Sequence, residues 1–203
     1  GGLSRPSKMP AHGYSIPARA CATGSKLREQ SGTVCSGCYA LKGRYVFPNV
    51  AAALERRLES LHDPRWIEAM SLLINHYEGK PGRGYSRWHD AGDLQSVEHF
   101  ANICEVARRT PNVRHWLPTR EYRIVAKARA AGVAIPANLT VRMSAHIIGG
   151  KVPTGFETFS TVSRTAGEYA SAHQCPAPTQ GNTCGDCRAC WNTATPHVNY
   201  VAH

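Results

Sequence analysis

The sequence has no long run of apolar residues. Nowhere in its 203 residues is there a stretch close to the roughly 20 consecutive apolar residues that a membrane-spanning helix needs. The amino-terminal residues also lack the apolar segment typical of a secretory signal peptide. We therefore expect no membrane partner and a cytoplasmic protein, a setting in which structural disulfides are rare.

Acidic residues are scarce as well. The chain has 14 Asp and Glu against 24 Lys and Arg, which gives a net charge of +10 and an isoelectric point near 9.4. Such a balance favours a polyanionic partner, above all nucleic acid. No helix–turn–helix, zinc-finger or RNA-binding motif accompanies it, and the basic residues are spread along the chain. A basic module that binds nucleic acid or a host protein therefore stays an alternative.

Cysteine, in contrast, is abundant and grouped. Seven of the eight cysteines fall into two glycine-rich groups, one near each end of the chain. The Cys-x2-Cys spacings within them let the chain turn so that both thiolates face one metal ion or cluster. The candidate metal ligands are Cys21, Cys35, Cys38, Cys175, Cys184, Cys187 and Cys190.

Three kinds of cysteine site compete. A tight triplet such as Cys184, Cys187 and Cys190, with a further cysteine elsewhere, is typical of an iron–sulfur cluster, here a 4Fe–4S cluster. Zinc more often uses two separated pairs of ligands, and disulfides suit small secreted domains. The spacing favours one or two iron–sulfur clusters, with zinc as the alternative. The remaining cysteine, Cys104, lies in an apolar stripe at helical spacing and is expected to be a small buried residue.

The middle of the chain alternates between strand-like and helix-like segments. Helices are expected over 49–61 and 64–78, then from Asp93 as N-cap to 109 and from Thr119 as N-cap to 131. Strands are expected over 85–89, 114–118, 140–148 and 156–162. This order predicts an α/β fold with βαβ units on a parallel sheet of roughly four to six strands, in the form of a partial or small barrel.

We expect a single α/β domain over residues 1–203. Within it, a cysteine- and glycine-rich segment (1–48) precedes the βα core (49–163), and a second cysteine-rich segment (164–203) follows. Parallel α/β folds place their chemistry at the carboxyl ends of the strands. Polar residues that follow the predicted strands are therefore candidate site residues: His89, Asp90, Asp93, Arg120, Ser144 and His146. Each also has a plain structural interpretation, such as an N-cap for Asp93 or a semi-buried histidine for His146.

Several motifs together resemble the phage gene product 88 family. They are Cys38-Tyr39-Ala40, the run from Arg87 to Leu94 (Arg-Trp-His-Asp-Ala-Gly-Asp-Leu), the run from Pro136 to Leu139, and the run from Cys184 to Trp191. The resemblance spans about Cys21 to Trp191. It implies a protein made in a bacterial host cell and carries no assigned reaction.

A broader similarity is to radical S-adenosylmethionine (SAM) enzymes, which hold a 4Fe–4S cluster on three cysteines of a partial barrel. The similarity implies that Cys21, Cys35 and Cys38 hold such a cluster, although their spacing is Cys-x13-Cys-x2-Cys instead of Cys-x3-Cys-x2-Cys. The carboxyl-terminal cysteines would hold an auxiliary cluster. The reduced cluster would pass one electron to SAM and generate a radical that abstracts hydrogen from a substrate.

The similarity also implies roles for the strand-end residues. Those nearest the reacting groups would be His89, Asp90, Asp93 and His146, and those that contact SAM would be Gly92, Asp93, Arg120 and Ser144. Three hypotheses follow: a radical-SAM-like enzyme, an electron-transferring or structural iron–sulfur protein, and a zinc-stabilised basic module. A single cluster that joins both ends of the chain is a further alternative, and the substrate cannot be deduced from the residues.

Overall fold

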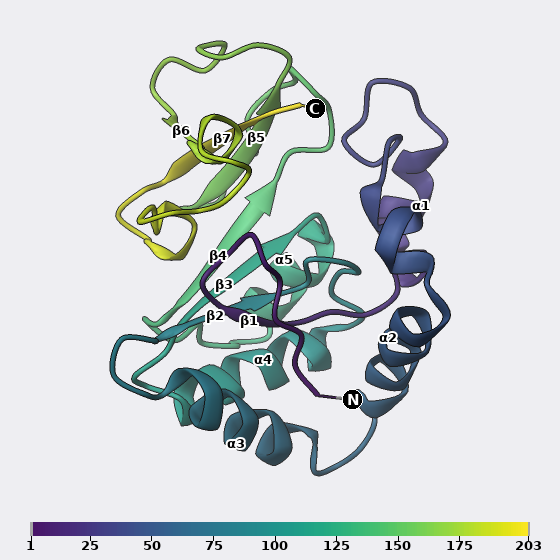
Figure 1. Cartoon of the computed structure of the whole chain (residues 1–203), viewed down its shortest axis with the longest axis vertical. Coiled ribbons are helices and arrows are strands. Elements are labelled where there is room, and N and C mark those ends of the chain that lie inside the picture. Colours follow the sequence, from purple (N-terminus) through teal and green to yellow (C-terminus); the bar gives the residue numbers. More distant parts are fainter. Residues whose placement is uncertain (1, 203) are drawn as a thin grey trace.

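In the computed structural model, which describes residues 2–202, one parallel sheet organises the chain (Figure 1). Its strand order is β1-β2-β3-β4-β5-β7-β6, and all neighbouring strands are parallel. The strands are β1 (His12–Tyr14), β2 (Tyr85–Trp88), β3 (Arg114–Thr119), β4 (Leu139–Ser144), β5 (Phe159–Ser163), β6 (His173–Gln174) and β7 (His197–Val201). The α/β class and the parallel sheet are therefore confirmed.

The expected barrel-like shape is not confirmed, because the sheet is open. β1 pairs with β2 at one edge, and β6 pairs with β7 at the other. Closing a barrel requires two edge strands long enough to form a ladder with each other. β6 has only two residues, so it cannot supply such a ladder. The sheet takes strands from all three segments of the chain.

The α-helices are α1 (Ala22–Arg28), α2 (Pro48–Ser60), α3 (Trp66–Glu78), α4 (Val97–Arg109) and α5 (Tyr122–Ala130). Short 3-10 turns are η1 (Ala18–Ala20), η2 (Tyr39–Leu41), η3 (Gly43–Val46), η4 (Ala177–Thr179) and η5 (Ala189–Trp191). Within residues 2–202, no helix is both long and apolar enough to cross a membrane.

Helices α3, α4 and α5 pack against one face of the sheet, which we call the helix face (Figure 1). Its core contains Trp66, Trp88, Phe100 and Leu117, and Cys104 is buried there as expected. Apolar residues recur along these helices at helical spacing, so each helix buries one stripe. This core fixes β2, β3 and β4 side by side.

The opposite face of the sheet, which we call the strap face, is covered by the carboxyl-terminal segment. Trp116 of β3 packs there against Ala189, Cys190 and Trp191 of η5. The indole of Trp191 donates a hydrogen bond to the Ser86 carbonyl of β2, at 2.8 Å. The residues between β6 and β7 (175–196) thus cover this face of the sheet, and we call them the strap segment.

Two predicted helix starts are wrong. Helix α4 begins at Val97 with Ser96 as N-cap, whose hydroxyl accepts the His99 N–H at 3.0 Å. Asp93 does not cap it, because its carboxylate is hydrogen-bonded to β3 and the residue after it. Helix α5 begins at Tyr122, and Thr119 is instead the last residue of β3.

Candidate functional site

The three amino-terminal cysteines, Cys21, Cys35 and Cys38, lie beyond the carboxyl end of β1; we call them the N-terminal cysteine group. Cys21 directly precedes α1, and Gly24 of that helix lies against it. The Sγ atoms of Cys21 and Cys35 are each 3.7 Å from the point that a Cβ on Gly24 would occupy. A glycine here therefore lets the two thiols approach the same space.

Cys38 belongs to the same group, because its backbone N–H donates to the Cys35 carbonyl at 3.2 Å. Burial raises the pKa of Cys21 to about 12, and the nearby Asp93, Cys38, Cys35 and Glu121 add to that rise. Burial also raises the pKa of Cys35, while Arg120 acts in the opposite direction. Thiols that raise one another's pKa values in this way would become ligands only when a cation replaces their protons.

The loop that carries Cys35 is fastened to the end of β4. The Val34 N–H donates to the His146 carbonyl at 2.9 Å, and the Ile148 N–H donates to the Gly32 carbonyl at 2.9 Å. Thr33 and Ile147 form an isolated antiparallel bridge between these hydrogen bonds. The loop therefore adds to the sheet beyond the last residue of β4 and holds Cys35 at the carboxyl edge.

Asp93 joins the ends of β2 and β3. Its Oδ1 accepts the Thr119 hydroxyl at 2.5 Å and the Leu94 N–H at 2.8 Å, and its Oδ2 accepts the Arg120 N–H at 2.9 Å. Burial raises the pKa of Asp93 to about 6, against the lowering effect of these donors. Its carboxylate thus accepts hydrogen bonds from backbone and hydroxyl groups at the carboxyl ends of β2 and β3.

Glu121 fixes the start of α1 through its carboxylate. Its two oxygens accept the Thr23 N–H at 2.7 Å and the Thr23 hydroxyl at 2.8 Å. The buried carboxylate therefore holds the first turn of α1, where its charge also faces the helix amino terminus. Sequence analysis missed this role, although Glu121 lies only three residues after the predicted strand 114–118.

The other predicted strand-end residues divide between the two faces. His89 is buried against His99 of α4, with ring centroids 5.3 Å apart, and its backbone is left-handed (φ 57°). Neither ring nitrogen of His89 has a hydrogen-bond partner among the described residues. This contact with α4 places the His89 ring on the helix face. Asp90 instead accepts the Tyr45 hydroxyl at 2.8 Å.

Arg120, Ser144 and His146 lie at the ends of β3 and β4. The Arg120 Nε donates to the Ala145 carbonyl at 3.4 Å, and its charge acts on Cys35. His146 stacks on Tyr122 with a centroid separation of 4.5 Å. The hydroxyls of Ser144 and Ser160 are hydrogen-bonded at 3.3 Å. Of these three residues, Arg120 acts electrostatically on a cysteine of the group, since its positive charge lowers the pKa of Cys35.

The carboxyl-terminal cysteines, Cys175, Cys184, Cys187 and Cys190, form a second group on the strap face; we call them the C-terminal cysteine group. The Cys187 N–H donates to the Cys184 carbonyl at 3.0 Å, which closes a tight turn. The thiols raise one another's pKa values: Cys187 acts on Cys175, Cys175 and Cys187 act on Cys184, and Cys175 acts on Cys190. Every thiol in the group is thus close to another thiol of the same group.

Two further side chains contact this group. His173 Nε2 lies 3.3 Å from the Cys187 sulfur, and the Tyr200 hydroxyl lies 3.2 Å from the Cys190 sulfur. Burial raises the pKa of Cys190 to about 11, although the hydrogen bond from Tyr200 lowers it. Neither His173 nor Tyr200 was predicted, because no spacing rule links them to the cysteines.

Arg142 of β4 holds the strap segment in place. Its fully buried guanidinium donates to five backbone carbonyls at 3.0 to 3.2 Å. The acceptors are Phe159, Ala189, Asn192, Thr195 and Pro196. The arginine therefore binds the chain on both sides of Trp191 and fixes the position of Cys190 above the sheet.

All eight cysteines have free thiols, so the disulfide interpretation finds no support. Within residues 2–202, no set of three or more His, Cys, Asp and Glu side chains is arranged around one metal-ion position. Four ligands of one zinc ion must converge on a single point. In an iron–sulfur cluster the thiolates bind different irons and stand farther apart.

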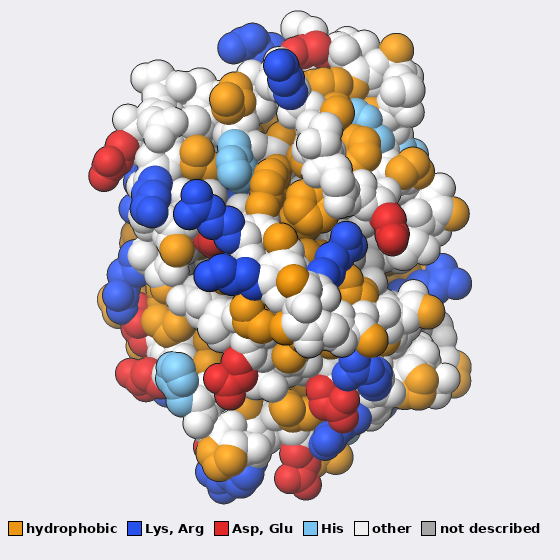
Figure 2. Space-filling view, turned by 180° about the vertical axis from the view of Figure 1, so that it is seen from behind, with side chains coloured by type: hydrophobic (Ala, Val, Ile, Leu, Met, Phe, Trp, Pro, Cys, Tyr) orange, Lys and Arg blue, Asp and Glu red, His pale blue; other side chains and the backbone are white. Residues whose placement is uncertain are grey.

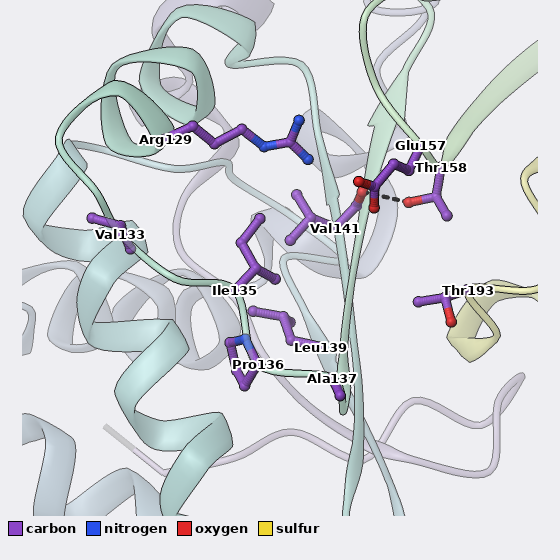
Figure 3. A pocket seen from close by; sticks show the side chains of 10 residues that line it. All are labelled: Arg129, Val133, Ile135, Pro136, Ala137, Leu139, Val141, Glu157, Thr158 and Thr193. Atoms are coloured by element: carbon purple, nitrogen blue, oxygen red, sulfur yellow. Dashed lines mark hydrogen bonds between the residues drawn. The ribbon is translucent and has the colours of Figure 1, made fainter.

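A cavity of about 520 Å³ lies elsewhere, beside the first residues of β4 (Figure 3). Ile135, Leu139 and Val141 provide its apolar wall, and Arg129 and Glu157 project from α5 and from the segment before β5. The residues that line it belong to neither cysteine group. It thus lies near the amino end of β4, whereas the N-terminal cysteine group lies near the carboxyl end.

The basic residues do not form one continuous patch on the face shown in Figure 2. Lys and Arg side chains are spread from the bottom to the top of this face and alternate with acidic ones in its lower half. The net charge of +10 therefore gives no single docking surface on this side.

Comparison with known proteins places the chain in a family. No curated protein and no solved structure matches the sequence. The model of the family described as Gene product 88 matches residues 2–193. This match covers nearly the whole chain and both cysteine groups. The chain therefore belongs to the Gene product 88 family, the phage family that its motifs resemble.

Proposed function

We propose that this phage protein is an iron–sulfur protein with two separate sites, one on each cysteine group. The observation that carries the proposal is the grouping of seven free thiols at two places in the fold, with Cys21 and Cys35 both against Gly24 and the Cys187 N–H bonded to the Cys184 carbonyl. We infer that it acts in the cytoplasm of the bacterial host, where thiols stay reduced. Zinc in the C-terminal group is the alternative metal.

The N-terminal cysteine group would hold a cluster through three thiolates. Three protein ligands leave one iron of a 4Fe–4S cluster without a cysteine, so a small molecule such as SAM could bind there. A cluster of this kind supplies single electrons to the molecule bound at the open iron. This assignment makes the protein radical-SAM-like and an enzyme, and its support is the place of the group beyond β1, at the carboxyl edge of a parallel sheet.

The residues around this group have distinct parts in the proposal. Arg120 would offset the negative charge of the Cys35 thiolate. Asp93 and Glu121 would hold the β3 end and α1 in register, so that Cys21 and Cys35 face each other. Gly92 would act through packing rather than through contact with SAM, because a Cβ there would lie 2.2 Å from Ile16 Cγ1.

The C-terminal cysteine group would hold its cluster through four thiolates. A fully ligated cluster has no open iron, and it transfers electrons or stabilises the fold. His173 and Tyr200 would donate hydrogen bonds to cluster ligands, which is one way in which a protein tunes a reduction potential.

The test is iron and acid-labile sulfide analysis of protein purified without oxygen. We expect about eight irons and eight sulfides per chain for two 4Fe–4S clusters. Replacing Cys21, Cys35 and Cys38 with Ser should remove half of the iron and any spectral change on addition of SAM. Replacing the four cysteines of the C-terminal group should remove the other half and leave the SAM response.

Cys104→Ser is the matched control, because Cys104 lies in the helix-face core and belongs to neither group. It should leave the iron content unchanged. Zinc without sulfide would overturn the iron–sulfur proposal, and about four irons lost together from either set of variants would show one shared cluster.

A second candidate function is binding of single-stranded nucleic acid. Tyr39 and Phe47 are 55% and 54% exposed, and the exposed Lys42 and Arg44 lie between them in the sequence. Aromatic rings beside cations are typical of surfaces on which bases stack. Fluorescence anisotropy with a labelled oligonucleotide tests this function, and Phe47→Ala should weaken binding by roughly tenfold or more per lost base stack. Anisotropy that does not change would leave the metal sites as the sole candidate.

A further inference from the structure

The connection from β4 to β5 leaves part of the helix face without a helix. Parallel strands are usually joined by a helix that packs on the sheet, and α5 joins β3 to β4 in this way. Residues 145–158, which join β4 to β5, contain no helix. The place beside α5 is therefore not filled by a further helix, and the cavity of about 520 Å³ lies there (Figure 3).

This cavity has an apolar wall and a volume that suits a small molecule. Ile135, Leu139 and Val141 form the wall, and the last two are only 2% and 8% exposed. Ligand sites are commonly concave and largely apolar, with volumes of roughly 300–1,000 Å³ and a few polar groups that orient the ligand. The wall alone would accept any apolar group, so the charges at its edge decide which ligand fits.

Two opposite charges face each other at one end of the wall. Arg129 projects from the last turn of α5 and Glu157 from the segment before β5, and their side chains point towards one another in Figure 3. Among the residues that the structure describes, neither takes part in an ion pair. The Phe156 ring lies 5.7 Å from the Arg129 guanidinium carbon and leaves the planar donors of that group available. Both charges are therefore free to bind a ligand.

A second cavity, of about 360 Å³ beside α3, lacks this combination. Its cation, Arg65, already forms an ion pair with Asp63 at 2.9 Å. The guanidinium of Arg65 is therefore not free for a ligand in the way that the Arg129 guanidinium is. Of the two cavities, the one beside β4 joins an apolar wall to an unpaired cation and an unpaired anion.

We propose that the cavity beside β4 binds a free α-amino acid with a large apolar side chain. Such a molecule carries its carboxylate and its ammonium on one carbon, so both charges lie at one end. Arg129 would bind the carboxylate through its planar fork of donors, and Glu157 would bind the ammonium. The side chain would lie along the wall of Ile135, Leu139 and Val141. The site uses no cysteine, so this inference is independent of the proposed iron–sulfur function.

The experiment is isothermal titration calorimetry of the full chain, purified without oxygen, with L-phenylalanine and separately with L-leucine. We expect saturable binding of at least one of them. Glycine has both charges but no apolar side chain, and 3-phenylpropanoate and 4-methylpentanoate are the analogues of the two amino acids without the ammonium. Each of these three compounds should bind at least about tenfold more weakly than the amino acid.

Three variants assign the binding to this cavity. Arg129→Gln and Glu157→Gln each remove one charge at an exposed position, so the fold should persist while binding weakens by about tenfold. Ala137→Phe keeps both charges and adds a large side chain to the lining, so it should compete with the ligand for the cavity. Arg123→Gln is the matched control, because Arg123 is exposed on the same helix and does not line the cavity. It should bind the amino acid as the wild type does.

The proposal is overturned if neither amino acid binds, if binding survives in both charge variants, or if Arg123→Gln abolishes it. It is equally overturned if an analogue without the ammonium binds as tightly as its amino acid, since the ligand would then be an apolar carboxylate. Iron and sulfide are measured on the same samples. A protein without a cluster that binds the amino acid would contradict the proposed function alone, and a protein with both clusters that does not bind it would contradict this inference alone.

Discussion

Gly92 occupies a position at which an added methyl group would collide with Ile16, two residues after the end of β1. A Cβ there would lie 2.2 Å from Ile16 Cγ1 and 2.7 Å from the Ile16 carbonyl oxygen, and its φ is 81°. The Ile16 N–H also donates to the Ala91 carbonyl at 3.1 Å. This close approach brings the ends of β1 and β2 together beneath the N-terminal cysteine group.

Gly92→Ala should therefore destabilise the protein strongly. We expect a loss of about 2–5 kcal/mol, because left-handed backbone strain adds to overpacking against Ile16. Gly132→Ala is the matched control, with a similar φ of 79° and nothing within 4 Å of the added Cβ, and it should cost only about 1–2 kcal/mol. Urea unfolding of both variants is the measurement, and equal losses would show that contact with Ile16 does not matter.

His115 provides a pH-dependent contribution to stability. It is fully buried, accepts the Trp88 indole N–H at 3.3 Å and pairs with the Thr110 hydroxyl at 2.8 Å. Burial lowers the pKa of His115 to about 3. The unfolded chain binds this proton near pH 6.5, so stability is complete above that pH and falls as the pH drops towards 3.

His115→Gln should flatten this dependence. Between pH 6 and pH 4, the unfolding free energy of the wild type should fall more steeply than that of the variant, by about 1.4 kcal/mol per pH unit. Denaturant unfolding at several pH values measures both slopes. Parallel slopes would mean that His115 takes up its proton in the folded protein.

At the scale of elements, the strap segment depends on one side chain of β4. Arg142 donates to five carbonyls of residues 159–196. Arg142→Lys keeps the charge but cannot reach all five acceptors. We expect a loss of about 2–5 kcal/mol, since buried carbonyls are left without donors.

Hydrogen exchange should locate that loss. Protection should fall in η5 and β7, where the strap segment contacts the sheet, and iron should be lost from the C-terminal cysteine group alone. Arg108→Lys is the control, because Arg108 donates to the Ala134 carbonyl from an exposed position. Uniform loss of protection over the whole sheet would contradict a local role for Arg142.

Helix α1 depends in the same way on Glu121. Glu121→Ala removes both acceptors of Thr23 and should cost about 1–3 kcal/mol. Exchange of the amides of Ala22–Arg28 should become faster, while β5 and β7 stay protected. Unchanged exchange in α1 would show that Cys21 is held by packing against Gly24 instead.

At the scale of the whole molecule, the cysteine groups contribute unequally to stability. The C-terminal cysteine group connects the chain next to β6 with the turn at Cys184 and with η5. The Cys184 N–H also donates to the Lys8 carbonyl at 2.9 Å. These segments have short strands and little apolar core of their own. A bound metal stabilises them by mass action, since it binds only the folded arrangement.

Metal removal should therefore loosen one part of the molecule. Treatment with a chelator should lower the Tm and remove amide protection from β6 and β7 first, while β2, β3 and β4 keep theirs. Hydrogen exchange of loaded and metal-free protein measures the difference. Simultaneous loss of protection over all strands would show that the metal sites stabilise the entire sheet.

Local patterns were sufficient for the central part of the fold. The periodicity of apolar residues predicts α2, α3, α4, α5 and the strands β2, β3, β4 and β5. The reason is that apolar residues of these elements pack into the core of the helix face. The strands β1, β6 and β7 were not predicted. They are short or polar, and they form because their backbones hydrogen-bond to neighbouring strands of the sheet.

The site was predicted unevenly. Cysteine spacing identified seven candidate ligands, and the structure brings them into two groups. The predicted contacts of Asp93 and Gly92 with a cofactor stay predictions; in the structure the Asp93 carboxylate accepts the Thr119 hydroxyl, and Gly92 packs on Ile16. Arg142 was not selected, because the sequence does not show which arginines turn inward.

The sequence by itself determined the family, the α/β class and the grouping of the cysteines, since composition, spacing and periodicity are local properties of the chain. Only the tertiary structure decided that the sheet is open and that the strap segment covers one face. It also decided that the Arg142 guanidinium meets five backbone carbonyls of residues 159–196. The physical reason is that hydrogen-bond partners far apart in sequence meet only when the sheet is complete.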